Sequence, residues 1–196
     1  MERDTDADLL ARLAAQPQAA FGDVVTTYGG LVFGVCLRVL REPATAEDIA
    51  QDALVNAYRA LSSYPRERIL ALRLRPWLAR IALNLARNSL RSHRTSTTLE
   101  GDFEPSAPST DEPLSLAQRR EERDMWARLL SELPERYRLA VALRHVDGLS
   151  YSELAEALGR PAGTVKSDVH RGLALLRAAY DAEQRRAARP RHRQAV

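Results

Sequence analysis

The sequence predicts an all-α protein that consists of two small helical domains joined by a flexible acidic linker, with a helix-turn-helix in the second domain. Three observations lead to this prediction. Apolar residues recur at helical spacing on both sides of the linker, and no stretch shows the alternating apolar and polar pattern of a strand. Near the C-terminus, two helical segments flank a short glycine-containing turn.

The linker is defined by its composition. Residues 95–113 combine three prolines and five acidic residues with many Ser and Thr side chains, and they offer little to bury. We therefore expect a first domain over 1–94, a second domain over 114–182 and a basic tail over 183–196.

The first domain is expected to contain several amphipathic helices. Apolar residues from Phe21 to Val39 recur every three or four positions. A second helix is expected after Thr45, whose hydroxyl can cap a helix that carries Asp48 in its first turn. A third is expected to begin near Pro76. Its expected core residues are Trp77, Leu78, Ile81, Ala82 and Leu85. We expect Trp77 to pack in the core, with stacking on bases as the alternative.

The second domain carries the strongest local motif. A helix is expected to start near Pro134, and a short helix over 150–158 should end at Gly159, with Ser150 and Glu153 forming a capping box at its start. A longer helix should follow after a few residues, which completes a helix-turn-helix. Its expected core residues are Leu154, Ala155, Leu158, Val165, Val169, Leu173 and Leu176.

Charge is strongly segregated along the chain, although the formal net charge is only +3. The segments 53–94 and 160–196 carry net charges of +8 and +6, whereas 1–52 and 95–118 each carry −5. Solvated helix faces can produce single charged runs. Two basic blocks on either side of an acidic linker instead favour two surfaces for polyanions and an acidic surface for another partner.

The two basic segments each offer a surface for DNA. Along 76–94, basic and amide side chains form a continuous stripe that can follow a phosphate backbone while Asn reaches bases. The expected contact residues of this stripe are Arg80, Asn84, Arg87, Asn88, Arg91 and Arg94. The exposed face of the last helix is typical of a recognition helix, with a purely structural hairpin as the alternative. The expected contact residues there are Thr164, Lys166, Ser167, His170 and Arg171.

Two further segments leave alternatives open. The helix after Thr45 carries Asp48, Gln51, Asp52 and Val55 away from its small buried residues, which fits either a protein contact or a solvated face. The arginine-containing segment over 62–76 fits either a loop that meets single-stranded nucleic acid or a simple connection.

Several function classes are disfavoured. Cys36 is the only cysteine, so we expect it in the core and expect no multi-cysteine metal site. The histidines do not cluster at metal-ligand spacing and no phosphate-binding glycine loop is present, so we expect no metal, no cofactor and no enzymatic activity. The acidic start lacks a signal-peptide pattern, and no apolar run approaches about 20 residues, which predicts a cytoplasmic protein without membrane insertion.

Several blocks of sequence, taken in order, resemble the bacterial RNA polymerase sigma factors of the extracytoplasmic-function (ECF) type. The blocks are Ala46–Asp52, Trp77–Asn84, Leu90–Arg94, Leu133–Arg138, Ser152–Ala155 and Gly163–Ser167. The resemblance spans nearly all of residues 20–180. The alternative is an autonomous helix-turn-helix regulator with a helical sensor or dimerisation domain, which would bind duplex DNA tightly without polymerase.

The resemblance implies a sigma factor that binds core RNA polymerase and directs promoter recognition, promoter melting and transcription initiation in a stress response. Asp48, Gln51, Asp52 and Val55 would dock on the β′ clamp helices, and the second domain would meet the β flap. The stripe would bind the minus-ten element, and the recognition helix would read the minus-thirty-five element. The linker would lie in the polymerase channel near the RNA exit path. An anti-sigma factor would mask these surfaces until a signal arrives.

Three positions depart from the family pattern. Asp168 stands where the family usually has Arg, and Gly172-Leu173 replaces Ala-Arg, so both changes are expected to remove positive charge from the recognition helix. Leu83 stands where the family often has a basic or polar residue. Because a mismatched base pair costs about 1–3 kcal/mol, such changes are expected to redirect promoter specificity.

Overall fold

The structure, a computed structural model, describes residues 2–96 and 114–187, and within these ranges it contains nine helices and no strand. The all-α prediction is confirmed. The helices before the linker, which we call the N-terminal domain, are α1 (Glu2–Ala15), α2 (Pro17–Leu40), α3 (Pro43–Ser63), α4 (Arg66–Leu70) and α5 (Leu74–Ser96). The C-terminal domain comprises α6 (Leu114–Glu132), α7 (Glu135–His145), α8 (Tyr151–Leu158) and α9 (Ala162–Ala187). The predicted linker, from residue 97 on, and most of the predicted tail lie outside the described residues.

Helix α2 is the central helix of the N-terminal domain. It packs against α1, α3 and α5, and Val24, Val32 and Val35 are fully buried. An 18-residue window of α2 has a mean hydropathy of 1.5, so by length and composition alone this helix could cross a membrane. The expectation concerned uninterrupted apolar runs, and α2 carries the charged residues Asp23 and Arg38 within its 24 residues. Burial of its apolar face against the neighbouring helices accounts for this composition.

Helix α3 begins with an N-cap that differs from the predicted one. The Glu42 carboxylate accepts hydrogen bonds from the backbone N–H groups of Ala44, at 2.9 Å, and Thr45, and Pro43 occupies the first turn. These bonds, above all the bonds to Thr45, lower the pKa of Glu42. Thr45 itself lies inside the first turn. A carboxylate satisfies the unpaired N–H groups and opposes the positive end of the helix dipole.

Helix α5 begins at Leu74, two residues before the predicted start. Its most deeply buried residues are Leu74, Leu78, Ala79, Ala82, Leu83 and Ala86. Of the predicted core residues, Leu78 and Ala82 are buried, whereas Trp77, Ile81 and Leu85 are only partly buried and pack against the core. Burial of Leu83 also explains its apolar character. Trp77 packs against the core beside Tyr64, with ring centroids 6.3 Å apart, as expected of a packed side chain.

The helix-turn-helix is confirmed. Helix α8 starts with the capping box formed by Ser150 and Glu153, and it ends at Gly159, whose φ of 63° lies in the left-handed region that favours glycine. The expected motif core is largely buried, but Leu173 is 37% exposed, which corrects its assignment to the core. Helix α9 continues to Ala187, so the first residues of the predicted tail are helical.

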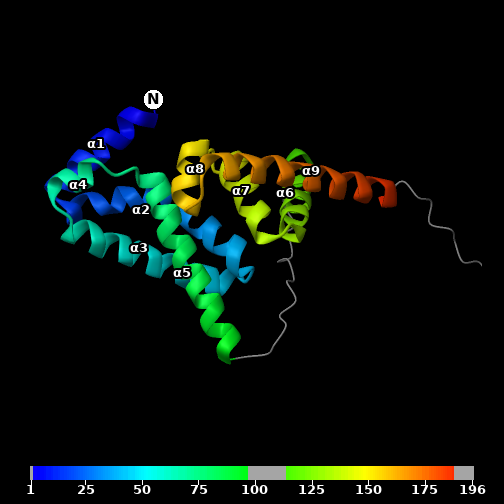
Figure 1. Ribbon diagram of the computed structural model, residues 1–196, viewed down its shortest axis with the longest axis horizontal. Helices are drawn as coiled ribbons and strands as arrows, with labels where there is room; N and C mark the ends of the chain where they lie inside the picture. Colours follow the sequence, from blue (N-terminus) through cyan, green and yellow to red (C-terminus); the bar gives the residue numbers. More distant parts are fainter. Residues whose placement is uncertain (1, 97–113, 188–196) are drawn as a thin grey trace, which may run out of the picture.

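The two domains share one hydrophobic core. Helix α8 lies beside α5, and α7 packs against α2 (Figure 1). Buried leucines of α7 and α8, such as Leu143 and Leu154, belong to the same cluster as the core of α2, α3 and α5. The C-terminal domain thus covers part of the helix that carries the predicted basic stripe.

Candidate nucleic-acid interface

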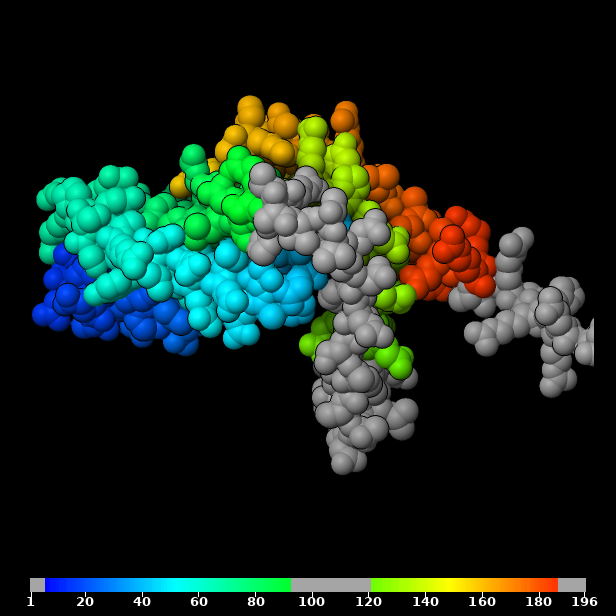
Figure 2. Space-filling view, turned by 90° about the horizontal axis from the view of Figure 1, so that it is seen from below, coloured from blue at the N-terminus to red at the C-terminus, as the bar shows by residue number. Residues whose placement is uncertain are grey.

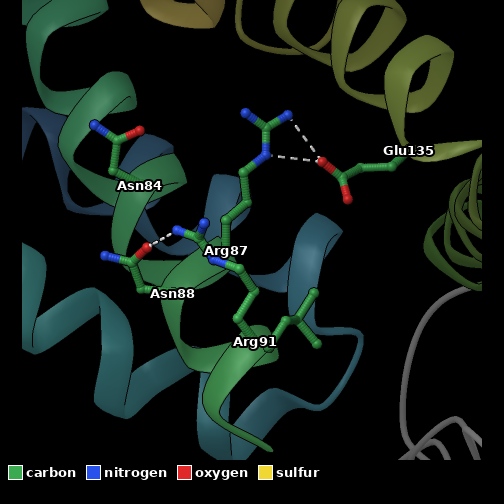
Figure 3. A pocket seen from close by; sticks show the side chains of 6 residues that line it. Asn84, Arg87, Asn88, Arg91 and Glu135 are labelled. Carbon is green, nitrogen blue, oxygen red and sulfur yellow. Dashed lines mark hydrogen bonds and ion pairs between the residues drawn. The ribbon is translucent and has the colours of Figure 1, made fainter. Parts of the chain in front are cut away.

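The predicted stripe on α5 lies at the surface next to the C-terminal domain. Arg80, Asn84, Asn88 and Arg91 are exposed, and Arg87 is half-buried. Most of these residues line the hollow shown in Figure 3. It is lined by Asn84, Arg87, Asn88, Leu90 and Arg91 of α5 and by Glu135 at the start of α7. The side chain of Arg94 lies outside the described residues.

Glu135 is a member of this site that the sequence did not indicate. Its Oε1 accepts hydrogen bonds from Arg87 Nε at 3.0 Å and from Arg87 Nη2 at 2.9 Å. Beside this pair, Arg91 donates to the Asn88 side-chain carbonyl (Figure 3). Each partner of the Arg87–Glu135 pair keeps about a third of its side chain in solvent, and such pairs contribute only about 0.2–1 kcal/mol. A phosphate group can therefore compete with Glu135 for Arg87.

A second set of arginine contacts holds the domains together at the end of α2. Arg138 of α7 donates from Nε to the Arg38 carbonyl oxygen at 2.9 Å and from Nη1 to the carbonyl oxygens of Ser131 and Leu133 at 3.0 and 2.8 Å. Burial, followed by the nearby charge of Arg41, lowers the pKa of Arg138 to about 10. This buried guanidinium satisfies carbonyl groups of both domains.

Asp147 lies at the same interface. Its carboxylate accepts a hydrogen bond from Arg38 at 2.9 Å, and its backbone carbonyl accepts one from Arg75. Burial raises the pKa of Asp147, although the Arg38 charge opposes the shift. Desolvation of this carboxylate therefore outweighs the attraction of its partners.

The segment over 62–76 also contacts the C-terminal domain. It contains the short helix α4, and the Arg68 guanidinium lies 3.6 Å from the centre of the Tyr64 ring. Arg73 lies 3.3 Å from Ser152 Oγ and 3.4 Å from the Glu156 carboxylate, both on α8. Arg73 therefore contacts α8 of the C-terminal domain instead of pointing only into solvent.

The predicted face of the recognition helix α9 is at the surface. Lys166, Ser167, His170 and Arg171 are exposed, and Thr164 is half-buried. Ser167 Oγ donates to the Gly163 carbonyl oxygen at 3.0 Å, which leaves its lone pairs as acceptors. Positive, donor and acceptor groups thus share one exposed surface, as direct readout of base edges and phosphates requires.

Two of the predicted departures do not lie on this surface. Asp168 is 0% exposed and is paired with Arg136 and Arg160. Gly172 is buried against α7. The expected loss of positive charge at Asp168 therefore does not affect the exposed face of the recognition helix. In the Gly172-Leu173 pair, Leu173 is the residue that stands in place of Arg, and it is 37% exposed, so the expected loss of positive charge does affect the surface there.

The predicted polymerase-binding residues occupy one exposed face of α3. Asp48, Gln51 and Asp52 are exposed, and Val55 is 44% exposed between them and the end of the helix. Helix α3, light blue to cyan, spreads over the face of the molecule seen in Figure 2. Its acidic and apolar surface is accessible to another protein.

Cys36 is buried in the core of the N-terminal domain, as expected, and burial raises the pKa of its thiol to about 11. Among the described residues, no group of three or more His, Cys, Asp or Glu side chains is arranged to hold a metal ion.

Comparison with known proteins matches both domains to one family. Residues 24–96 match Sigma-70 region 2, and residues 123–176 match Sigma-70, region 4. The chain is 32% identical over 173 residues to the ECF RNA polymerase sigma factor SigW of Bacillus subtilis, covering 82% of this chain and 88% of SigW. It is 33% identical over 179 residues to the ECF RNA polymerase sigma-E factor of Escherichia coli K12, covering 87% and 91%.

Two solved structures share the fold of this chain. CnrH, in complex with the cytosolic domain of CnrY, superimposes with a TM-score of 0.65 at 27% identity, over 90% of this chain and 97% of CnrH. The sigma factor RpoE of Bartonella quintana, in complex with the anti-sigma factor NepR, gives a TM-score of 0.65 over 82% of this chain and 96% of RpoE. At 22% identity, the second likeness shows the fold alone.

Proposed function

The chain belongs to the sigma-70 family of bacterial RNA polymerase sigma factors, in its extracytoplasmic-function group, and from this premise we propose how its surfaces divide the work of initiation. As a sigma factor it binds core RNA polymerase and directs promoter recognition, promoter melting and transcription initiation. The observation that carries the division is the separation of two exposed basic surfaces, on α5 and α9, from an exposed acidic and apolar face on α3.

The α3 face binds the polymerase. Asp48, Gln51, Asp52 and Val55 dock on the β′ clamp helices, and the C-terminal domain meets the β flap. Exposed carboxylates around an exposed valine support a contact with a basic, partly apolar helix. Domains over 1–94 and 114–182, joined by the acidic linker over 95–113, allow both contacts to form at once.

The two basic surfaces bind promoter DNA. On α5, the stripe binds the minus-ten element and stabilises its melted form through Arg80, Asn84, Arg87, Asn88, Arg91 and Arg94. On α9, the recognition helix enters the major groove at the minus-thirty-five element with Thr164, Lys166, Ser167, His170 and Arg171. The region 2 match over the N-terminal domain supports this assignment over an autonomous helix-turn-helix regulator.

The chain acts in the cytoplasm, has no enzymatic activity of its own, and leaves the chemistry of RNA synthesis to the polymerase. A protein partner of the anti-sigma class holds it inactive until a stress signal arrives. The likeness to CnrH, which is bound to the cytosolic domain of CnrY, supports regulation by a bound protein.

Run-off transcription tests the proposed function. Core polymerase from the source bacterium, supplied with this chain, is expected to produce transcripts from promoters selected out of genomic fragments, and core polymerase alone is not. Absence of promoter-specific transcripts, together with tight duplex binding by the chain alone, would instead favour the autonomous regulator.

A pull-down tests the docking face. Asp48→Arg/Asp52→Arg is expected to lose binding to core polymerase, because it places like charges against a basic partner. Reversal of two exposed carboxylates of the C-terminal domain, Glu122→Arg/Asp181→Arg, is the matched control and should retain binding. Equal β′ binding by both double variants would reject the α3 assignment.

A further inference from the structure

The recognition helix carries a charged residue on its buried side. Asp168 is 0% exposed, although Lys166, Ser167 and His170 around it all lie at the surface. A buried carboxylate is stable only where charged or hydrogen-bonding partners replace water. Here both carboxylate oxygens have such partners.

Two arginines from outside α9 supply them. Asp168 Oδ1 accepts a hydrogen bond from Arg136 Nε at 2.8 Å and forms an ion pair with Arg136 Nη2 at 2.6 Å, and Asp168 Oδ2 accepts a hydrogen bond from Arg160 Nη1 at 3.1 Å. Arg136 is the second residue of α7, and Arg160 lies in the turn between α8 and α9. The carboxylate therefore ties the recognition helix to the preceding helix and to the turn of the motif.

Because an α-helix is rigid, fixing Asp168 also fixes the orientation of the side chains on the opposite, DNA-facing side of α9. At 100° per residue, Lys166 and His170 lie about 160° to either side of Asp168, which is nearly the opposite face of α9. A rotation of α9 that broke the Arg136 or Arg160 bonds would move both side chains by the same angle. Holding Asp168 in place thus sets the direction in which they point.

Gly172 sets how closely α9 packs against α7. A Cβ atom at this position would lie 2.5 Å from Val141 Cγ2 and 3.2 Å from the Tyr137 carbonyl oxygen on α7. The absence of a side chain therefore allows α9 to lie close against α7. Asp168 opposes rotation of the helix about its axis, and Gly172 sets its distance from α7.

Stability alone is a weak reason for such an arrangement. Only the carboxylate is fully buried, since the Arg136 and Arg160 side chains are 45% and 31% exposed, and well-packed apolar residues at the sites of buried ion pairs are commonly as stable or more stable. Buried pairs do impose one geometry on their partners, because the charged group has few alternative positions that satisfy it.

We propose that Asp168 is a positioning residue of promoter recognition, which fixes the orientation of α9 through Arg136 and Arg160 and so sets the base preference at the minus-thirty-five element. The inference rests on the proposed function, because it assumes that α9 reads this element. Asp168 itself does not touch DNA.

The test compares base preferences rather than binding strength. Holoenzyme reconstituted with the wild-type chain selects duplexes from a pool that is randomised at the minus-thirty-five positions, and the preference is the affinity ratio between the best sequence and its single-base variants. Asp168→Asn keeps the shape but removes the charge, and it is expected to reduce this ratio about tenfold. Asp168→Glu retains the charge and should recover most of the ratio. Asp181→Asn, at an exposed position of the same helix, should match wild type.

This readout separates positioning from folding. If Asp168 only stabilised the domain, Asp168→Asn would lower the active fraction equally for all sequences and leave the ratio unchanged, which would overturn the proposal. If Asp168→Asn does not fold, as judged by circular dichroism, Arg160→Gln replaces it, because that variant leaves the Arg136 bonds in place. An unchanged ratio in folded Arg160→Gln would likewise reject the proposal.

Arg136→Gln provides a further comparison. Its side chain is 45% exposed and could also contact a phosphate, but loss of a phosphate contact weakens all sequences alike. A lowered ratio in this variant therefore supports positioning. If wild-type holoenzyme itself shows no preference at these positions, the assignment of α9 to the minus-thirty-five element fails, and the inference fails with it.

Discussion

The two basic surfaces of this sigma factor are built in opposite ways. On α5, the central cation of the stripe, Arg87, is paired with Glu135 of the other domain, so the acidic partner lies on the surface that we propose binds DNA. On α9, the acidic residue Asp168 is buried behind the helix, and the face with Lys166 and Arg171 is exposed. The α5 surface shares Arg87 with the C-terminal domain, whereas the α9 surface is held in place by the ion pairs of Asp168 on its buried side.

We therefore expect the two surfaces to be available to DNA under different conditions. DNA can reach the exposed groups of α9 while the domains remain packed together. Full contact of a phosphate with Arg87 requires that Glu135 give up its place, which couples use of the α5 stripe to the position of the C-terminal domain. The shared apolar core between α5 and α8 holds Glu135 near the stripe.

The largest expected effect is on α9. Lys166→Ala/Arg171→Ala should reduce the preference of the holoenzyme for its selected minus-thirty-five sequence about a hundredfold, because two base contacts are lost at about 1–3 kcal/mol each. Both residues are exposed, so the fold should be retained. Arg185→Ala/Arg186→Ala, near the end of the same helix, is the control for loss of two positive charges. Filter binding of the holoenzyme to the selected duplex and to a duplex with a changed minus-thirty-five sequence measures this preference. An equal loss of preference in the two double variants would contradict the assignment.

On α5, a smaller effect with a different signature is expected. Arg87→Ala/Arg91→Ala should slow open-complex formation about tenfold. In a plot of the logarithm of open-complex formation against the logarithm of the salt concentration, the variant should also show a slope that is smaller in magnitude by about 1–2. Each lost phosphate contact reduces this slope by about 0.7–0.9. Permanganate footprinting at several salt concentrations measures both. An unchanged salt slope would show that these arginines do not contact the DNA backbone.

A gain of function tests the sharing of Arg87 directly. Glu135→Gln should raise the affinity of the isolated chain for a single-stranded minus-ten oligonucleotide about threefold, because an exposed ion pair of roughly 0.2–1 kcal/mol no longer competes. Preference at the minus-thirty-five element should not change. Glu132→Gln, at an exposed position at the end of α6, is the matched control. Equal affinities of wild type and Glu135→Gln would mean that Glu135 does not restrict the stripe.

The sequence predicted the features of both surfaces that depend on local contacts. The capping box at Ser150 and the turn at Gly159 were found because their residues are close in sequence. Burial of Asp168 was missed, because a charged residue is normally exposed and its partner Arg136 lies 32 positions away. The only partial burial of Trp77, Ile81 and Leu85 on α5 has a similar cause. This helix packs against α2, α3 and α8, and apolar residues on several sides do not define one face.

The smallest expected effects are on stability, and they differ in sign between the two regions. Hydrogen bonds from Arg136, with the charge of Arg160 adding to them, lower the pKa of Asp168 despite its burial. The stabilising contribution of Asp168 is therefore present above the unfolded-state pKa of about 4 and is lost as the pH falls through the lower folded-state value. Wild type should lose stability relative to Asp168→Asn on acidification below about pH 4.

At the domain interface the sign is reversed. Burial raises the pKa of Asp147 despite the Arg38 charge, so the ionised carboxylate is less favourable in the folded chain than in the unfolded one. Wild type should therefore gain stability relative to Asp147→Asn as the pH falls from neutral through the folded-state pKa towards about 4. Urea denaturation at a series of pH values, with both variants beside wild type, measures the two trends. Parallel trends would contradict the contrast, because they would mean that the recognition-helix anchor and the domain interface respond to protons in the same way.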